Sequence, residues 1–345
     1  MIARPDVRLE VAAALYGGWT KIKITRGLEQ LAGTFDLEVT ERWPGQTAER
    51  PILEGDACRV LVDGTPVITG YVDEVKVSYD ATAHTVSISG RDKTCDLVDC
   101  CPPSTQMRSA NFVNLAKKLC APFGIEVVAE CDPGHAAPVK NNEGDTVFEC
   151  LEQQARARGI LLTTDGQGRL VITRLGNKRA GRGFKLGDNV RQAEASFSMR
   201  ERFSAYTVKA QSACAEAYWS AGAAAHGKGV AKDPGVTRHR PLTIIAEQDA
   251  QGMAQRRAQH ECNQRYGKSR QAVYTVYGWY GAGVLWAPGQ HADIDDPLAK
   301  LNTAWVIASV TWILDEQGWR SEITLCPPEA FSVEPPKQAG KGQTG

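Results

Sequence analysis

Alternation between hydrophobic and polar residues is the dominant pattern over the first hundred residues of the chain. A period of two is typical of β-strands that have one face on the core and the other in water. The pattern predicts strands over residues 19–26, 35–40, 58–62, 67–77 and 84–90. Asp63-Gly64 has the composition of a tight hairpin turn, and Gly33 and Pro44-Gly45 mark breaks between strands. Four to six antiparallel strands in this order favour a closed or half-closed barrel or a sandwich.

The apolar spacing changes to that of helices after Pro102-Pro103. One helix is predicted to begin at a cap, Ser109 or Asn111, and to run through residue 121. A second helix is predicted from an Asp145 cap to residue 158. Strands are predicted over residues 125–129, 160–164 and 169–174. This mixture of helices and short strands predicts a compact α+β unit.

The last third of the chain returns to strand patterns. They predict strands over residues 203–210, 240–246, 273–279, 290–294, 305–314 and 319–325. A polar helix capped by Asp249 is predicted to reach residue 266. Residues 212–235 are rich in alanine, glycine and polar residues and are expected to form a long mobile loop.

One hairpin pattern occurs twice. The hairpin at residues 67–88 is echoed at residues 305–325, and each follows a strand that a glycine introduces, Gly55-Asp56 in one and Gly289-Gln290 in the other. The echo indicates two related β domains on either side of an insert. The predicted fold class is therefore mainly β with an α+β insert. The predicted divisions are a β domain at 1–103, the α+β domain at 104–188, a second β domain at 189–328 and a disordered tail at 329–345.

Composition narrows the classes of function. The 345 residues are 42% hydrophobic, which is ordinary for a globular protein and too apolar for a disordered one. Basic and acidic residues both number 40, so the chain lacks the basic excess of proteins that grip nucleic acid through phosphates. The first five residues have no signal-peptide character and no apolar run approaches 18 residues, so cytoplasmic folding without a membrane span is expected. The ten cysteines form no CxxC pair and are predicted to be reduced, mainly structural thiols.

Residues that could carry chemistry are sparse and poorly spaced. His260-Glu261-Cys262 is a tight group of metal-ligand types, but helical neighbours one or two apart face different directions. His84 is expected to be a satisfied or exposed histidine, and Gly181–Gly187 lacks dinucleotide-binding spacing and is predicted to be a loop. The carboxylate groups that could serve a glycosidase lie at strand edges or turns, where acids favour solvent. They are Asp73-Glu74, Asp293 with Asp295-Asp296, and Asp315-Glu316.

We therefore predict no catalytic, cofactor-binding or metal-binding residues, no cofactor and no enzymatic activity. The most charged turn, residues 90–99, is open to two interpretations. In the first, its arginine and aspartates pair locally and have no further role. In the second, the turn has a function, which is to fix the junction between the β domain and the insert or to make a subunit contact. Individual interface residues cannot be assigned from alternation alone.

Distinctive runs occur in order from about residue 15 to residue 331. They are residues 18–37, 69–73, 90–100, 119–124, 157–161, 202–209, 236–241 and 278–279. Together they resemble the Mu-type baseplate hub proteins of contractile phage tails, a tail-tube-like hub family. The departures are a shorter C-terminal tail and the alanine-rich residues 212–232.

The resemblance implies a structural protein of the virion, assembled in the host cytoplasm without stable membrane insertion. It implies a homotrimer in which each chain has two tube-like antiparallel β-barrel domains and a smaller α+β domain. The implied partners are the hexameric tail tube or a distal tube protein above, the trimeric central spike below and the surrounding wedge proteins. DNA would pass through the lumen without specific binding.

Two other classes of function stay open at this stage. A cell-wall-degrading hub–hydrolase would need an additional catalytic domain, for which the sequence after the last predicted strand is expected to leave no room. The hub of a phage-like bacteriocin or of a type VI secretion spike is the other alternative. Type VI spikes usually carry a fused β-needle domain, which this sequence lacks.

Overall fold

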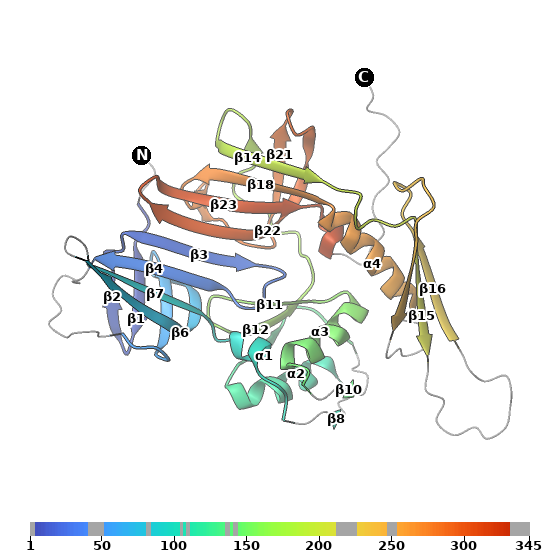
Figure 1. The fold of residues 1–345 in the computed structure, drawn as a ribbon, viewed down its shortest axis with the longest axis horizontal. Helices are drawn as coiled ribbons and strands as arrows, with labels where there is room; N and C mark the ends of the chain where they lie inside the picture. Colours follow the sequence, from blue (N-terminus) through green and yellow to red (C-terminus); the bar gives the residue numbers. More distant parts are fainter. Residues whose placement is uncertain are drawn as a thin grey trace. The chain divides into compact units, whose positions relative to one another are not determined.

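Strands make up most of the regular structure in the computed structural model of the chain (Figure 1). The structure describes residues 4–40, 52–80, 84–103, 106–107, 111–134, 139–140, 144–211, 226–246 and 254–331. The predicted fold class, mainly β with an α+β insert, is confirmed. Pro44-Gly45, Ser109 and Asp249 lie outside the described residues.

The elements of the first half match most of the predicted segments. The strands are β1 (Val7–Val11), β2 (Ala14–Tyr16), β3 (Lys21–Gly27), β4 (Thr34–Thr40), β5 (Ala57–Val62), β6 (Thr65–Tyr79), β7 (His84–Asp92), β8 (Gln106–Met107), β9 (Val127–Ala129), β10 (Val139–Lys140), β11 (Leu161–Thr164) and β12 (Leu170–Thr173). The helices are α1 (Cys95–Asp99), α2 (Phe112–Cys120) and α3 (Val147–Arg158).

The second half contains one long helix, α4 (Ala254–Lys268). Its strands are β13 (Phe184–Lys185), β14 (Val190–Phe197), β15 (Ala205–Gln211), β16 (His226–Lys232), β17 (Pro241–Ala246), β18 (Arg270–Tyr277), β19 (Tyr280–Gly281), β20 (Val284–Leu285), β21 (His291–Asp296), β22 (Leu301–Asp315) and β23 (Gly318–Cys326). The chain divides into two compact units. The larger holds residues 1–155, 160–194 and 272–325, and the smaller holds the remainder.

One sheet of 13 strands dominates the structure. Its strands run in the order β14-β18-β23-β22-β3-β4-β7-β6-β5-β1-β2, and β21 joins β22 and β13 beside that path. The ladder between β22 and β3 joins strands from opposite ends of the sequence. Local alternation could not predict this ladder, because the pattern within a strand does not name a distant neighbour.

Tight turns set the register of the first hairpins. Asp63 and Gly64 both have positive φ, 48° and 77°, as the predicted turn between β5 and β6 requires. Ala12 and Ala13 also have positive φ, 48° and 66°, between β1 and β2. Alanine carries no sequence signal for such a turn, which explains why this hairpin was not predicted.

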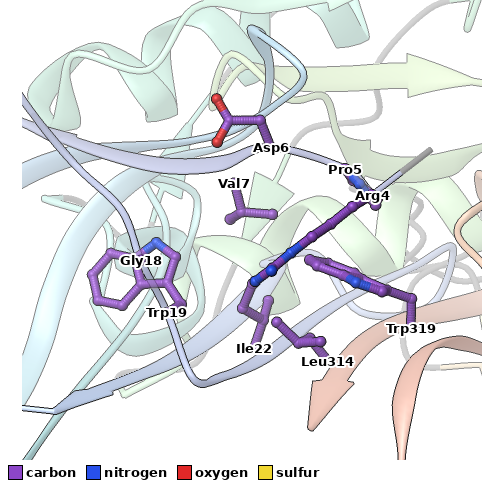
Figure 2. Close-up of a pocket in the computed structure, with 9 residues that line it drawn as sticks. All are labelled: Arg4, Pro5, Asp6, Val7, Gly18, Trp19, Ile22, Leu314 and Trp319. Carbon is purple, nitrogen blue, oxygen red and sulfur yellow. The ribbon is translucent and has the colours of Figure 1, made fainter.

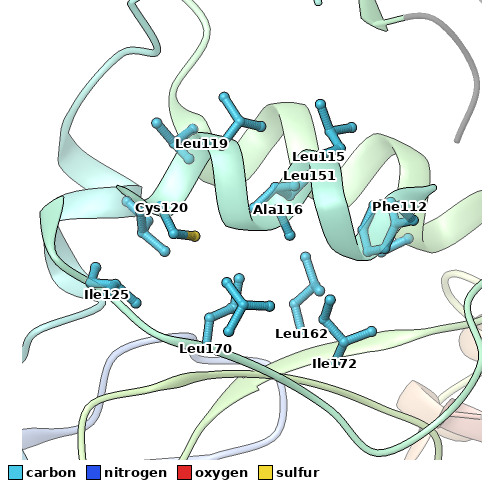
Figure 3. Packing of buried hydrophobic residues seen from close by; sticks show 14 of the residues in the cluster. Phe112, Leu115, Ala116, Leu119, Cys120, Ile125, Leu151, Leu162, Leu170 and Ile172 are labelled. Carbon is cyan, nitrogen blue, oxygen red and sulfur yellow. The ribbon is translucent and has the colours of Figure 1, made fainter. Parts of the chain in front are cut away.

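The α+β region packs two helices on a three-stranded sheet of order β11-β12-β9 (Figure 3). Leu115 of α2 and Leu151 of α3 face Leu170 of the sheet, and all three side chains are fully buried. Asn111 caps α2, because its side chain accepts a 2.7 Å hydrogen bond from the backbone N–H of Val113.

The predicted cap of the second helix is wrong by one residue. Thr146, not Asp145, forms a reciprocal capping box with Glu149. The Thr146 hydroxyl accepts from the Glu149 N–H at 3.2 Å, and the Glu149 carboxylate accepts from the Thr146 N–H at 2.8 Å. The T-x-x-E spacing is the stronger signal because it satisfies two backbone donors at once.

The smaller unit is a three-stranded sheet, β16-β15-β17, packed against α4. Residues 226–232, which were expected to lie in a mobile loop, form β16 and pair with β15 along its length. Gly227 and Gly229 weaken the local strand signal, but the ladder supplies partners for the backbone. A second difference concerns the tail expected from residue 329. Residues Pro328–Phe331 form a 3-10 turn, and the Phe331 side chain is buried.

Candidate functional site

The larger unit contains a structural repeat that matches the echo in the sequence. Strands β5, β6 and β7 have 6, 15 and 9 residues, and β21, β22 and β23 have the same lengths. Gly55 donates its N–H to the Val72 carbonyl at 2.8 Å, and Gly289 donates to the Ile307 carbonyl at 2.9 Å. In both repeats the residue after the glycine accepts a 2.9 Å hydrogen bond from that same strand residue. The backbone thus enters both repeats in the same way.

The strand order extends the repeat to five strands. The order β3-β4-β7-β6-β5 in one part of the sheet corresponds to β14-β18-β23-β22-β21 in the other. Strands that are adjacent in the sheet therefore form two units of one design within one chain.

The two repeats meet through the ladder between β22 and β3. Residues 309–314 of β22 pair antiparallel with residues 22–27 of β3. The hydroxyls of Thr25 and Thr311 lie 3.1 Å apart across the ladder. Ile24 and its partner Trp312 are both fully buried. This junction is a combination of backbone pairing and apolar packing, as in a continuous sheet.

The charged turn at residues 90–99 lies where β7 leaves the sheet. Asp92 is fully buried and accepts a 2.8 Å hydrogen bond from the Gly33 N–H. Burial raises the pKa of its carboxyl to about 7, while the nearby Arg26 guanidinium and the backbone donors oppose that rise. Arg26 in turn donates to the Thr164 carbonyl at 2.7 Å, in the hairpin of the α+β region.

Further contacts fasten the α+β region to β6 and to the charged turn after β7. The Thr69 hydroxyl donates to the Gly166 carbonyl at 2.8 Å, and Lys93 donates to the Gly124 carbonyl at 2.9 Å. A Cβ at Gly166 would lie 2.1 Å from the Pro66 carbonyl oxygen, so this close approach requires glycine. Local pairing also occurs, since Arg91 binds Asp73 at 2.7 Å. The contacts support the interpretation that the turn fixes the junction with the insert.

The possible metal ligands around His260 face different surroundings. Cys262 is fully buried in the core of the smaller unit, whereas Glu261 pairs with Arg257 at 3.1 Å. Burial lowers the pKa of His260, so its neutral form is favoured. Within the described ranges, no group of three or more His, Cys, Asp or Glu residues could hold a metal ion.

The cysteines behave as small hydrophobic residues in the described part of the chain. Those at positions 58, 95, 120, 150, 262 and 326 are buried. Burial raises the pKa of Cys58, Cys95 and Cys120 to about 12, which keeps these thiols protonated. A reactive thiolate is not favoured at these positions.

Most of the carboxylates that could have formed a hydrolytic pair are bound to basic or hydroxyl side chains. The partners are Arg91 for Asp73, Lys76 for Glu74, Arg179 for Asp293, Lys185 for Asp295, Tyr274 for Asp296 and Arg320 for Asp315. Hydrogen bonds from Arg320 lower the pKa of Asp315. A general acid needs the opposite shift, so Asp315 is unsuited to that role.

Two other candidates take structural places. Residues 184–185 within the predicted loop Gly181–Gly187 form β13, which pairs parallel with β21. A Cβ at Gly181 would lie 2.2 Å from the Gly281 carbonyl oxygen, so the close approach of two backbones accounts for this glycine. The His84 ring lies 5.6 Å from the Tyr79 ring at the exposed end of the β6–β7 hairpin.

A surface pocket of about 280 Å³ lies beside the end of the β22–β3 ladder (Figure 2). Its apolar lining comes from Pro5, Val7, Trp19, Ile22, Leu314 and Trp319. The Arg4 guanidinium lies 5.4 Å from the centre of the Trp319 ring, and Asp6 is the one carboxylate among the lining residues. A single acid beside a stacked arginine lacks the paired groups that hydrolysis needs.

Sequence comparison identifies domains of phage baseplate proteins along the chain. Residues 6–92 match the N-terminal domain of Mu phage baseplate assembly protein GpP-like proteins. Residues 94–174 match the second domain of baseplate hub protein gp44-like proteins, and residues 250–334 match the fourth domain of Mu phage GpP.

Whole-chain relatives agree with these domain matches. The chain is 33% identical to baseplate hub protein gp44 of Escherichia phage Mu over 340 residues, covering 95% of this chain and 89% of that protein. The 43 kDa tail protein of prophage MuSo2 from Shewanella oneidensis has 39% identity and a TM-score of 0.83, with 95% and 99% of the two chains covered. The tail protein from Neisseria meningitidis MC58 shares the fold at 24% identity and a TM-score of 0.81, again over 95% and 99%.

The described part of the chain contains no helix long and apolar enough to cross a membrane. The residues that the structure brings together are those of the two repeats and of the strands at their edges. Of these, β14 was not predicted as a strand, because most of its residues are exposed on both faces and show no clear alternation.

Proposed function

Because the chain belongs to the Mu-type baseplate hub proteins of phage tails, we propose that it is a homotrimeric symmetry adaptor in the baseplate. One end of the trimer would bind the hexameric tail tube or a distal tube protein, and the other the trimeric central spike. Wedge proteins would surround it, and DNA would pass through its lumen without specific binding. The protein is a component of the virion tail, and we propose that it assembles in the host cytoplasm.

The observation that carries this proposal is the internal repeat. Each chain holds two five-strand units of the same order, joined by the β22–β3 ladder. Three chains would therefore present six similar units, which is the number that a six-fold tube ring can match. The same trimer has a true three-fold axis for a three-fold spike.

The proposed domains are the two tube-like β domains at 1–103 and 189–328 and the α+β domain at 104–188. The equal totals of 40 basic and 40 acidic residues do not argue against passage of DNA, which a strongly basic lumen would retain.

We propose a mechanical rather than an enzymatic role. The relatives with substantial identity are described as a baseplate hub protein and a tail protein. Asp73, Asp293, Asp296 and Asp315 are engaged with basic or hydroxyl partners. Likeness to the type VI secretion protein c3393 of E. coli, at 11% identity and a TM-score of 0.56, shows a shared fold alone.

Light scattering after size-exclusion chromatography tests the trimer. The expected mass is three times that of the 37.4 kDa chain, and negative-stain images should show a three-fold ring with a central channel. A species that stays monomeric at all accessible concentrations, with spike protein present, would refute the adaptor. Clearing of peptidoglycan in a zymogram, abolished by a carboxylate substitution, would refute the non-enzymatic role.

A further inference from the structure

Two of the longer strands in the large sheet, β6 and β14, each have an edge that lacks a neighbour among the described residues. β6 pairs with β5 over residues 65–71 and then continues to Tyr79 with β7 as its only partner in the described ranges. β14 ends the sheet, and β18 is the only strand that pairs with it within the described part of the chain. Such edges present rows of backbone N–H and C=O groups that can pair with another strand.

β22 of the second repeat corresponds to β6, and its equivalent edge is covered by another strand. In β22, residues 301–306 pair with β21 and residues 309–314 pair with β3. Alignment through the shared hydrogen bonds of Val72 and Ile307 places Val77 at the position of Trp312 and Tyr79 at that of Leu314. This free half of β6 therefore occupies the place that the β22–β3 ladder uses.

Exposure differs sharply between the matched positions. Trp312 and Leu314 are 0% and 8% exposed beneath the ladder, whereas Val77 and Tyr79 are 46% and 74% exposed. The free edge thus carries large apolar side chains at the positions that the covered edge buries. A strand added along β6 would remove this apolar surface from water.

The second free edge belongs to β14, which corresponds to β3 of the other repeat. The Ser198 N–H donates to the Ser269 carbonyl at 2.8 Å, so continuation of the antiparallel ladder directs the backbone groups of Ala193 and Ala195 away from β18. β14 therefore offers to a neighbour the pairing that β3 offers to β22.

We infer that residues 73–79 of β6 pair with β14 of a second copy of this chain. The pairing repeats between subunits the ladder that β22 and β3 form within one chain. The inference rests on the homotrimer proposed above, and it adds which edges meet. The contact is head-to-tail, so each subunit uses one edge of each kind, and in the proposed trimer three such contacts close a ring.

Substitutions on the two edges test the pairing. Val77→Glu places a charge where the matched Trp312 is buried, and it should weaken self-association by roughly a hundredfold or more. Ala193→Pro removes an N–H from the outer side of β14 and should have a similar effect. Leu298→Glu changes a side chain that is 83% exposed and lies in the turn between β21 and β22, and it is the matched control.

Mixing the variants gives a sharper result than either alone. Each variant should be monomeric by light scattering, and the Leu298→Glu control trimeric. An equal mixture of Val77→Glu and Ala193→Pro retains one intact edge of each kind, so it should give a dimer and no trimer. Circular dichroism of the monomers should match that of the wild type.

The outcomes separate the two proposals. Trimeric Val77→Glu and Ala193→Pro with unchanged concentration dependence would overturn the edge assignment and leave the trimer standing. Monomeric variants that fail to form a dimer on mixing would overturn the head-to-tail pairing. A wild type that stays monomeric at all accessible concentrations, with spike protein present, would overturn both proposals. Hydrogen exchange on the wild type needs no variant: slow exchange at residues 73–79 and 190–197 is expected in the trimer, and fast exchange there would refute the pairing.

Discussion

The wild-type protein should lose unfolding free energy as the pH rises from 4 to 7, and replacing Asp92 with asparagine should remove this loss. The Asp92 carboxyl is fully buried at the end of β7 and accepts hydrogen bonds from the N–H groups of Gly33 at 2.8 Å and Thr69 at 3.3 Å. Burial raises its pKa to about 7 from the ordinary value of 3.8, although Arg26 favours the ionised form. The folded chain therefore holds a proton at Asp92 over a pH range in which the unfolded chain has released it.

The sign and size of the effect follow from this difference. The stabilisation from the bound proton is fully present below pH 4 and is lost progressively as the pH rises to 7, after which the whole penalty applies. A pKa difference of about three pH units, at 1.36 kcal/mol for each, corresponds to about 4 kcal/mol of unfolding free energy. Asparagine does not titrate, so Asp92→Asn should lack this loss.

Urea denaturation of both proteins from pH 4 to pH 8, at one protein concentration and ionic strength, measures the effect. The free energy of unfolding of the wild type minus that of Asp92→Asn should fall by about 4 kcal/mol across the window. Asp188→Asn, which removes an exposed carboxylate, is the control substitution. Parallel curves for the wild type and Asp92→Asn would show that Asp92 does not take up a proton on folding in this range.

Two further substitutions test local interactions. Thr146→Ala should destabilise α3 by about 1 kcal/mol because it breaks the capping box with Glu149, whereas Thr146→Ser should retain most of the stability in thermal unfolding. Equal loss in both variants would exclude the cap as the cause. Arg202→Met should cost about 3–5 kcal/mol, because it leaves the buried Asp233 carboxylate without its guanidinium partner at 2.8 Å. The double variant Arg202→Met/Asp233→Leu should recover much of that loss in chemical denaturation, and an equal or greater loss in the double variant would contradict this account.

Elements with local chemistry were predictable from the sequence, and elements with distant partners were not. The hairpin at Asp63-Gly64 and the helix capped by Asn111 both depend on neighbours within a few residues. The strand β16 and the exposed strand β14 have weak patterns of their own, and their strand conformation depends on pairing with β15 and β18. Tertiary pairing therefore overrides local propensity at these positions.

The candidate site shows the same division. The sequence echo predicted two related β units, because each hairpin repeats its own alternation. The β22–β3 ladder could not be predicted, since alternation places a residue on a face but does not identify the neighbouring strand. The free edges of β6 and β14 became visible only through comparison with that ladder.

A chain that contains two similar units can form only one junction between units within itself. The β22–β3 ladder uses one edge of each kind, which leaves one β6-type edge and one β14-type edge open in the described structure. A two-fold contact that pairs one edge with its own copy joins like edges and could not reproduce that ladder. Repeating the ladder between copies joins unlike edges, and a closed ring then contains an even number of units. The rotation across each junction decides how many chains close the ring, so six units require that the β22–β3 ladder turn one unit against the next by one sixth of a full turn.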